Sequence, residues 1–491
     1  MKLQYFCSLT LLVIVGLSAC TPQTSLPLPE EIEAVESGLT PSIVAKSDSA
    51  KTYSIAERMS HYNVPGVSIA IVTDGELHWA KGYGEANTQS GSQVDENTLF
   101  QAGSISKPIA ALAVLKLAEE GKVDLDADVN TYLADWKVED NRHTQNEKVT
   151  LRRLLTHTAG VTVHGFPGYA QTDTFPSVTT VLNGEGNTAS IEVDTIPGSI
   201  WRYSGGGYTI AQKVVADVSG VSFARYLDEN ILNPLGMTSS TYQQPLPDQY
   251  HAVASAAYNT QGELIDGLWH NYPELAAAGL WTTPTDLAKY CLAIQEIMAG
   301  ESGDILNKAT IEKMLTKHQN DWGLGPGVWG EGDSLMFGHG GKNEGFTNNM
   351  VASVHQDDAV IVMTNADNGG ALINEIFRSI ANQYDIMLNV SEPRVVEVAN
   401  LTPDELQGFA GTYHSYQPLF GITNYPLIAE AEEGKLIISD PNDGDRFELM
   451  PLVDSTFLDF QRRTEIVFQN RGDTLGFTIK NYNFDFYRVK E

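Results

Sequence analysis

The sequence contains very few cysteines. Among its 491 residues only Cys7, Cys20 and Cys291 are cysteines. Cys7 lies in an N-terminal stretch that we expect to be removed, so the remainder cannot form a disulfide framework. Cys291 follows Leu287 and Tyr290 at helical spacing, which favours a buried small hydrophobic residue over a nucleophile.

Basic residues are also scarce. The chain has 31 Lys and Arg against 62 Asp and Glu, which gives a formal net charge of -31. Such a surface repels nucleic acid and favours solubility, so we expect no nucleic-acid partner. A hydrophobic content of 42 % is nevertheless that of a globular protein with a large core. The charge says nothing about a reaction.

Long apolar runs are absent except at the N-terminus. After Lys2, residues 9–17 (LTLLVIVGL) are apolar, but this run is shorter than the ~20 residues that span a bilayer. The run and the small residues before Cys20 predict a signal peptide over 1–20. The segment 17–20 (LSAC) resembles a bacterial lipobox, which implies lipidation at Cys20; a plain secretory signal is the alternative.

We therefore expect an exported protein that is anchored to a bacterial membrane through lipid on Cys20. The next residue, Thr21, resembles the sorting signal for the outer membrane, on its periplasmic side. Residues 21–45 begin with a stretch rich in Pro, Thr, Ser and Glu, and we interpret them as a tether.

The length of the chain predicts two or three domains. Strand patterns over 67–72 and 77–80 precede a helix-rich middle third, and strand patterns return over 349–354 and 359–364. This order predicts an α+β domain over 46–388, in which both ends share one antiparallel sheet flanked by helices, with an all-helical subdomain between them.

The C-terminal part has a different pattern. Beyond a junction at 386–402, short alternating strands such as 435–438 and 465–468 are separated by turn signals. This pattern predicts a small antiparallel β-barrel or sandwich over 400–491.

A possible nucleophile lies in the segment 103–108 (GSISKP). Ser104 and Lys107 are at positions i and i+3, on one face of a predicted helix that runs from Ser104 to about Glu120. A lysine amine with a lowered pKa can take the proton of a serine hydroxyl and make it nucleophilic. A Ser-x-x-Lys pair also arises by chance, as a capping Ser with a surface Lys. The apolar helix that this pair opens favours the catalytic interpretation.

Several blocks resemble the serine β-lactamase and penicillin-binding-protein superfamily. The resemblance spans about residues 50–385 and is nearest to the branch with class C β-lactamases, D-aminopeptidases, D-alanyl-D-alanine carboxypeptidases and related esterases. The blocks are FQAGSISK (100–107), LRRLLTHTAG (151–160), PLGM (234–237) and GLWTTPTDL (279–287). The resemblance implies that Ser104 is the nucleophile and Lys107 its base. The C-terminal strands resemble the lipocalin-like domains that some family members carry.

The family's Tyr-x-Asn motif corresponds here to Tyr203-Ser204-Gly205. The resemblance implies that Tyr203 shuttles protons with Lys107; an ordinary half-buried tyrosine is the alternative. Gly205 replaces the Asn, which removes an amide that could hold a substrate's acylamino group. This departure makes β-lactam hydrolysis less expected.

The family's third motif, Lys-Thr-Gly, corresponds here to His339-Gly340-Gly341. The resemblance places these residues and Lys342 on the strand beside the site, with the backbone N–H groups of Ser104 and Lys342 as the oxyanion hole. A structural loop or core histidine is the alternative for His339.

Two further patterns suggest no catalytic role. The segment 325–330 (GPGVWG) matches a dinucleotide fingerprint but lacks the βαβ context. His157, at the end of a predicted helix, is interpreted as structural.

The sequence thus predicts a serine hydrolase that acts on an ester or amide, such as a D-amino-acid peptide, a peptidoglycan fragment or a small ester, with no metal or cofactor. A true β-lactamase and a non-catalytic binding or scaffold lipoprotein remain alternatives. The sequence does not predict an oligomeric state.

Overall fold

The computed structural model describes residues 29–301, 305–388, 390–442, 444–453, 456–460 and 462–489. The predicted signal peptide and Cys20 lie outside these residues. Within them, no helix combines the length and the apolar character that crossing a bilayer requires.

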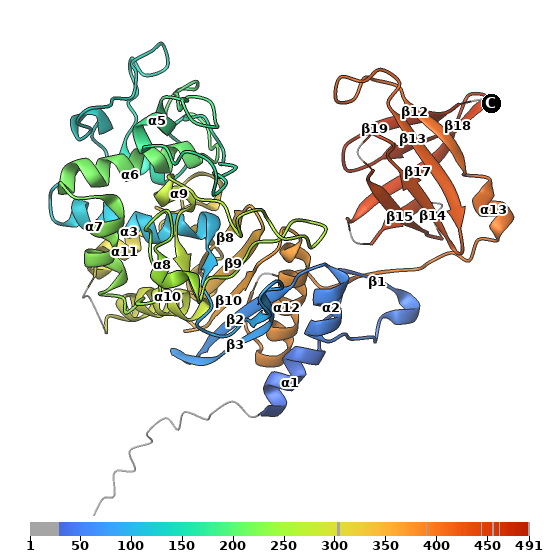
Figure 1. Cartoon of the computed structure of the whole chain (residues 1–491), viewed down its shortest axis with the longest axis horizontal. Coiled ribbons are helices and arrows are strands. Elements are labelled where there is room, and N and C mark those ends of the chain that lie inside the picture. The colour runs from blue at the N-terminus through green and yellow to red at the C-terminus, as the bar shows by residue number, and fades with distance from the viewer. Residues whose placement is uncertain are drawn as a thin grey trace, which may run out of the picture.

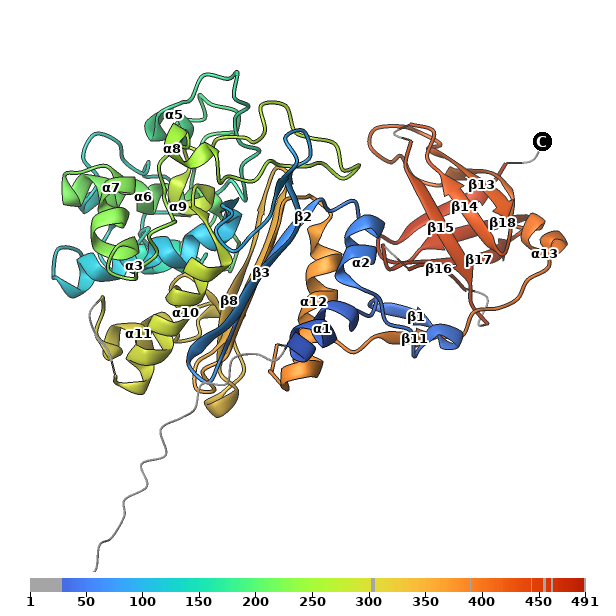
Figure 2. The ribbon, with the colours of Figure 1, turned by 60° about the horizontal axis from the view of Figure 1, so that its bottom comes forward.

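The centre of the larger domain is a seven-stranded antiparallel sheet (Figures 1 and 2). Its strand order is β4-β3-β2-β10-β9-β8-β7. The bounds are β2 Gly66–Thr73, β3 Glu76–Asn87, β4 Ser92–Gln93, β7 Gly327–Trp329, β8 Met336–Asn343, β9 Phe346–Ser353 and β10 Ala359–Thr364. Since β10 lies between β2 and β9, the two ends of the domain form one sheet, as the sequence predicts.

Side chains of the central strands alternate between two hydrophobic cores. On β2, Ile69 and Ile71 face one core, whereas Ala70 and Val72 face the other. Strand β10 alternates in the same way, and all six of its residues are buried. A strand that is buried on both faces needs apolar residues at every position, which is why AVIVMT reads as an uninterrupted hydrophobic run.

Helices cover both faces of this sheet. Figure 2 shows α1, α2 and α12 on one side and the remaining helices of the domain on the other. The bounds are α1 Pro29–Ser37, α2 Ile55–His61, α3 Ser106–Glu119, α4 Leu151–Leu155, α5 Val178–Leu182, α6 Gly205–Ser219, α7 Phe223–Leu227, α8 Asp248–His251, α9 Leu275–Ala278, α10 Pro284–Ala299, α11 Lys308–Met314 and α12 Gly369–Tyr384. Two short strands, β5 (Phe100–Gln101) and β6 (Trp281–Thr282), pair beside the start of α3.

Part of the predicted tether is folded. Residues 29–37 form α1, which packs against α12, and Val35 is fully buried there. Strand β1 (Ile43–Ala45) pairs with β11 (Arg394–Val396), which lies inside the predicted junction. The larger fold therefore includes residues well before position 46.

The C-terminal residues form a closed eight-stranded antiparallel barrel with an aromatic-rich core, after the short helix α13 (Pro403–Gln407). The barrel strands are β12 Gly411–Ser415, β13 Pro426–Glu432, β14 Lys435–Ser439, β15 Arg446–Pro451, β16 Thr456–Asp459, β17 Thr464–Arg471, β18 Thr474–Ile479 and β19 Phe484–Arg488. Ile43 and Val396 of the β1–β11 ribbon pack against Leu452 and Leu458 of the barrel, so the ribbon joins the two domains.

Candidate active site

Ser104 and Lys107 lie at the start of a buried helix. Ser104 belongs to a turn of 3-10 helix (η2, Gly103–Ile105) that leads directly into α3. The Lys107 amine donates a hydrogen bond of 2.9 Å to the Ser104 hydroxyl and one of 2.8 Å to the carbonyl of Ala277. The predicted pair is therefore in contact. The helix N-terminus also provides a field that favours negative charge on the serine oxygen.

The surroundings of Lys107 favour the neutral amine. Helix α3 is apolar and buried on nearly every side, because it lies between the sheet and the helical subdomain. Lys107 is only 2 % exposed, and burial lowers the pKa of its amine from 10.5 to about 7. No carboxylate among the described residues lies within salt-bridge distance of this amine. A substantial fraction of the amine is thus free to accept a proton at neutral pH.

Tyr203 lies beside the same amine. The Lys107 nitrogen is 4.9 Å from the centroid of the Tyr203 ring. Burial raises the pKa of the Tyr203 phenol well above its usual value, and a hydrogen bond with the Ser104 hydroxyl acts in the opposite direction. Tyr203 is therefore a protonated phenol in reach of Ser104, which suits a proton donor better than a resting base.

His157 holds the backbone on both sides of Tyr203. Its carbonyl accepts a hydrogen bond of 2.8 Å from the N–H of Arg202, and its Nδ1 accepts one of 3.0 Å from the N–H of Ser204. Its ring lies 4.2 Å from the Tyr203 ring. Burial and then the charge of Lys107 hold the pKa of His157 well below its usual value, so the ring stays neutral and Nδ1 can accept. The histidine interpreted as structural thus supports a predicted catalytic side chain.

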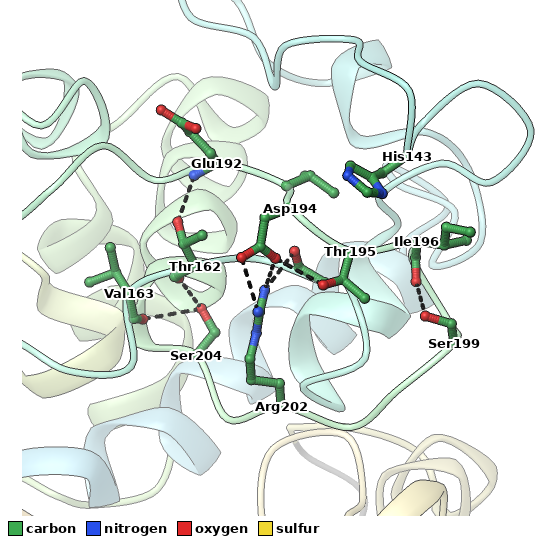
Figure 3. Close-up of polar contacts among 12 residues, drawn as sticks. His143, Thr162, Val163, Glu192, Asp194, Thr195, Ile196, Ser199, Arg202 and Ser204 are labelled. Atoms are coloured by element: carbon green, nitrogen blue, oxygen red, sulfur yellow. Dashed lines mark hydrogen bonds and ion pairs between the residues drawn. The ribbon is translucent and has the colours of Figure 1, made fainter.

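The loop before Tyr203 is fixed by a second set of polar contacts (Figure 3). Arg202 points toward Asp194 and forms a two-pronged ion pair with its carboxylate. The Ser204 hydroxyl donates to the carbonyl of Thr162 over 2.7 Å, and it also caps α6 by accepting from the N–H of Gly207. These contacts leave Tyr203 little freedom to move away from Ser104.

Strand β8 forms the opposite wall. Beyond Gly338 it has β9 as its partner on one side, while its other edge faces η2. The approach is very close: a Cβ at Gly341 would lie 2.0 Å from the carbonyl oxygen of Ala102. At Gly103, where φ is +54°, a Cβ would lie 2.5 Å from the amide nitrogen of Lys342. The Lys342 amide thus lies against the residue that precedes Ser104.

His339 faces the aromatic side of the site. Its ring lies 6.1 Å from that of Tyr203 and 5.3 Å from that of Trp322. Burial, followed by the charge of Lys107, lowers its pKa to about 3. The position that carries a lysine in the resembled motif is therefore occupied by a neutral ring.

A cleft of about 750 Å³ opens at Ser104. Its lining contains Ser104, Tyr203 and the predicted residues of β8, together with five residues that the sequence did not indicate. The lining residues are Ser104, His164, Trp201, Arg202, Tyr203, His339, Gly340, Gly341, Lys342, Thr347 and Asn348. Arg202 is engaged by Asp194, and the Lys342 amine is 63 % exposed and 3.7 Å from Asp367. The cleft therefore presents mainly aromatic and neutral polar surface.

Two contributors to the site carried no recognisable sequence signal. Trp322 comes from the loop after α11, yet it packs between His157 and His339. Gln319 of the same loop donates to the carbonyl of Gly198 over 3.0 Å, which links this loop to the one that carries Tyr203. The contacts of Trp322 with His157 and of Gln319 with Gly198 join segments more than 100 residues apart, so no local pattern predicts them.

A family comparison covers most of the larger domain. The family model described as Beta-lactamase matches residues 54–384, about two thirds of the chain. The chain belongs to the beta-lactamase family. It is thereby a member of the superfamily of serine β-lactamases and penicillin-binding proteins, which comprises serine hydrolases and transpeptidases.

Two curated members of this superfamily show how distant the relationships are. The chain is 24 % identical over 318 residues to Protein flp of Staphylococcus aureus, covering 62 % of this chain and 60 % of that protein. It thus spans about three fifths of the length of the first curated relatives that it matches. It is also 24 % identical over 378 residues to Penicillin-binding protein 4 of Amycolatopsis lactamdurans, covering 72 % of this chain and 94 % of that one.

Solved structures share this fold. The octameric penicillin-binding protein homologue from Pyrococcus abyssi matches with a TM-score of 0.60 and 23 % identity, covering 88 % of this chain and 98 % of its own. The structure of SurE with D-Leu matches with a TM-score of 0.55 and 21 % identity, covering 89 % and 97 %. These shares exceed the part matched by the family model, so the likeness extends beyond the beta-lactamase domain.

Cys291 and the segment 325–330 lie outside the cleft at Ser104. Cys291 is fully buried in α10, and burial raises the pKa of its thiol, as expected of a packing residue rather than a nucleophile. The segment 325–330 contains strand β7 and no helix. Among the described residues, no group of three or more His, Cys, Asp or Glu side chains could hold a metal ion.

Proposed function

We propose that this protein is a serine hydrolase that forms an acyl-enzyme on Ser104. The observation that carries the proposal is the contact of 2.9 Å between the Ser104 hydroxyl and a buried amine whose pKa is lowered to about 7. In the first step Lys107 takes the hydroxyl proton while the serine oxygen attacks an ester or amide carbonyl. The bond to the leaving group then breaks, and water later hydrolyses the acyl-enzyme.

Burial lowers the pKa of Lys107 and raises that of Tyr203, so we assign the two proton transfers of acylation to different groups. Lys107 has a lowered pKa and acts as the base for Ser104, whereas Tyr203 keeps its proton and can donate it to the leaving group. The Lys107 ammonium formed in the first step can then return a proton to Tyr203. The backbone N–H groups of Ser104 and Lys342 would stabilise the oxyanion, a contribution worth ~10²–10³ in rate for each donor.

The cleft supports a substrate with a neutral or apolar acyl part. His339 is uncharged, Arg202 is held by Asp194, and Trp201 and Tyr203 provide aromatic surface. We therefore propose esters or amides such as D-amino-acid peptides, peptidoglycan fragments or small esters. One protein of the same fold, SurE, is described in a structure with D-Leu, and a D-amino acid is the unit from which D-amino-acid peptides are built.

The space beside Gly205 argues against efficient β-lactam hydrolysis. A Cβ at Gly205 would lie 2.8 Å from the ring of Phe166 and 3.1 Å from the carbonyl oxygen of His164. The Phe166 ring therefore occupies the space into which an Asn side chain would project. An acylamino group of a substrate would meet this ring instead of an amide partner.

A labelling experiment tests the proposed nucleophile. A fluorophosphonate probe should modify the full chain and its Ser199→Ala variant, which loses an exposed hydroxyl in the loop before Tyr203, but not Ser104→Ala. Label that persists in Ser104→Ala contradicts the proposed nucleophile. A wild-type chain that takes no label favours the non-catalytic scaffold.

A substrate panel tests the proposed class. We expect turnover of p-nitrophenyl acetate or D-alanyl p-nitroanilide by wild type and none by Ser104→Ala. Turnover of nitrocefin at a rate comparable to that of the ester would favour a true β-lactamase.

We also propose that the protein is exported and lipidated on Cys20, from the short apolar run and the lipobox-like segment 17–20. Intact mass spectrometry of the protein from bacterial membranes should find a chain that begins at an acylated Cys20. A chain cleaved elsewhere, or Cys20→Ser that stays in the membrane fraction, would contradict lipidation.

A further inference from the structure

A second concave site lies far from Ser104 in the chain, where the barrel meets the larger domain. A pocket of about 320 Å³ is lined by Arg378 of α12, Arg394 of β11 and Arg463 from the turn between β16 and β17. Figure 2 shows α12, the β1–β11 ribbon and the barrel next to one another. In a chain with twice as many acidic as basic residues, three converging arginines are unusual.

Arg378 is a buried cation without a carboxylate partner. It is 4 % exposed, and within the described part of the chain its guanidinium donates only to the carbonyls of Thr40 and Ser391 and, over 3.4 Å, to the Ser42 hydroxyl. No carboxylate of the described residues lies within salt-bridge distance of it. Burial, opposed by nearby Glu375, lowers the pKa of Arg378. An uncompensated buried charge is costly, so this site would gain from a bound anion.

The acidic residue nearest in the fold is already engaged. Glu375 lies one helical turn before Arg378, and both of its oxygens bind elsewhere. One accepts from Arg58 Nε over 2.7 Å, and the other accepts from a second Arg58 nitrogen over 2.9 Å and from the Tyr62 hydroxyl over 2.6 Å. No hydrogen bond joins Glu375 to Arg378 among the described residues.

The other two arginines come from different elements. Arg463 donates to the same Ser42 hydroxyl as Arg378, and it has no carboxylate within salt-bridge distance among the described residues. Arg394 lies at the rim, where one of its nitrogens binds Glu465 over 2.5 Å. Among the described residues that line the pocket, the only carboxylate is the exposed Glu392. The lining therefore carries an excess of positive charge.

We propose that this pocket binds a phosphate group. Guanidinium groups that approach from three elements suit a tetrahedral anion with several oxygens, because each carries more N–H donors than the hydrogen bonds that it makes within the described residues. A bound phosphate would connect α12 and β11 to the barrel turn that carries Arg463, and would therefore fix the barrel on the larger domain. This site is independent of the chemistry at Ser104.

Calorimetric titration of the full chain with inorganic phosphate tests the site. The test variant is Arg463→Gln, and the matched control is its neighbour Arg462→Gln, because Arg462 pairs with Asp445 and does not line the pocket. We expect saturable binding to wild type and to Arg462→Gln, and at least tenfold weaker binding to Arg463→Gln, since hydrogen bonds to charged groups contribute ~1.5–3 kcal/mol. Phosphate should also raise the melting temperature of wild type but not of Arg463→Gln.

Two outcomes would overturn the proposal. One is no saturable phosphate binding to wild type, and the other is equal affinity of Arg463→Gln and Arg462→Gln. Titration with dihexanoylphosphatidylglycerol separates two sources of phosphate. Binding of this phosphodiester as well as inorganic phosphate supports a lipid headgroup as the ligand, whereas binding of inorganic phosphate alone supports a free phosphate or monoester.

Discussion

Replacement of Lys107 by Met should abolish acylation and stabilise the larger domain at the same time. Burial lowers the pKa of the Lys107 amine from 10.5 to about 7. At ~1.4 kcal/mol per pH unit, the protonated amine therefore lowers the unfolding free energy by ~5 kcal/mol below pH 7. The variant loses two hydrogen bonds, to Ser104 and to the Ala277 carbonyl, worth about 1 kcal/mol each. Lys107→Met should therefore be more stable than wild type by roughly 2–3 kcal/mol at pH 6.

The gain should depend on pH in a defined direction. Between pH 7 and 10.5 the unfolded wild-type chain binds a proton on this amine that the folded chain does not bind. The unfolding free energy of wild type therefore rises with pH across this window, whereas methionine contributes no such slope. The advantage of Lys107→Met should be full below pH 7, shrink by ~1.4 kcal/mol per pH unit above it and reverse at about pH 9, because the two lost hydrogen bonds then outweigh what remains of the desolvation cost.

Urea unfolding followed by tryptophan fluorescence measures this difference. All seven tryptophans lie between residues 79 and 329, so the signal reports the larger domain and not the barrel. Ser104→Ala is the control, because it is equally inactive but keeps the amine and should keep the wild-type slope. A stability difference between Lys107→Met and wild type that does not change from pH 6 to pH 10 would refute the inference that burial lowers the pKa of the Lys107 amine.

Three further outcomes follow from the same geometry. The rate of acylation (kcat/KM) should rise with pH and reach half its maximum near pH 7, because the neutral Lys107 amine is the base. A profile that is flat from pH 5.5 to 9 would contradict this assignment. Gly341→Ala should lose at least ~100-fold in kcat/KM, because its Cβ would press β8 away from the nucleophile. The control is Gly340→Ala, which should be tolerated because a Cβ at Gly340 has its nearest atom at 3.9 Å. Similar rates for the two variants would show that the close approach of β8 to η2 is unimportant. His157→Leu should reduce kcat by roughly 10–100-fold, since it leaves the Ser204 N–H without its acceptor. His157→Asn should recover part of the rate, because its amide oxygen can accept this hydrogen bond. Equal losses in both variants would assign His157 a packing role only.

Local sequence patterns predicted the contact between Ser104 and Lys107, but not all of the aromatic side chains that surround it. Ser104 and Lys107 are one helical turn apart, so a single helix suffices to bring them together. The contact of Trp322 with His157 depends on how segments from distant parts of the chain pack. Phe166, which fills the space beside Gly205, likewise belongs to a loop without periodicity.

The predicted tether shows how composition can mislead. The Pro- and Glu-rich residues before position 36 have the composition of a linker, yet part of them forms α1. Ile32, Val35 and Leu39 recur at helical spacing, and all three contribute to the core around α12. This short apolar periodicity was the signal that a folded segment begins there.

The pairing of β2 with β10 has a consequence for the order of events during folding. Ile69 lies opposite Val362 in this pairing, almost 300 residues further along the chain, so the central sheet has a very high contact order and should assemble slowly. The burial that lowers the basicity of Lys107 requires this sheet, and β8 comes from the same late part of the chain. An incomplete or unfolded polypeptide therefore carries an ordinary serine and an ordinary lysine, and reactivity arises only once the last third of the larger domain has been made and has docked.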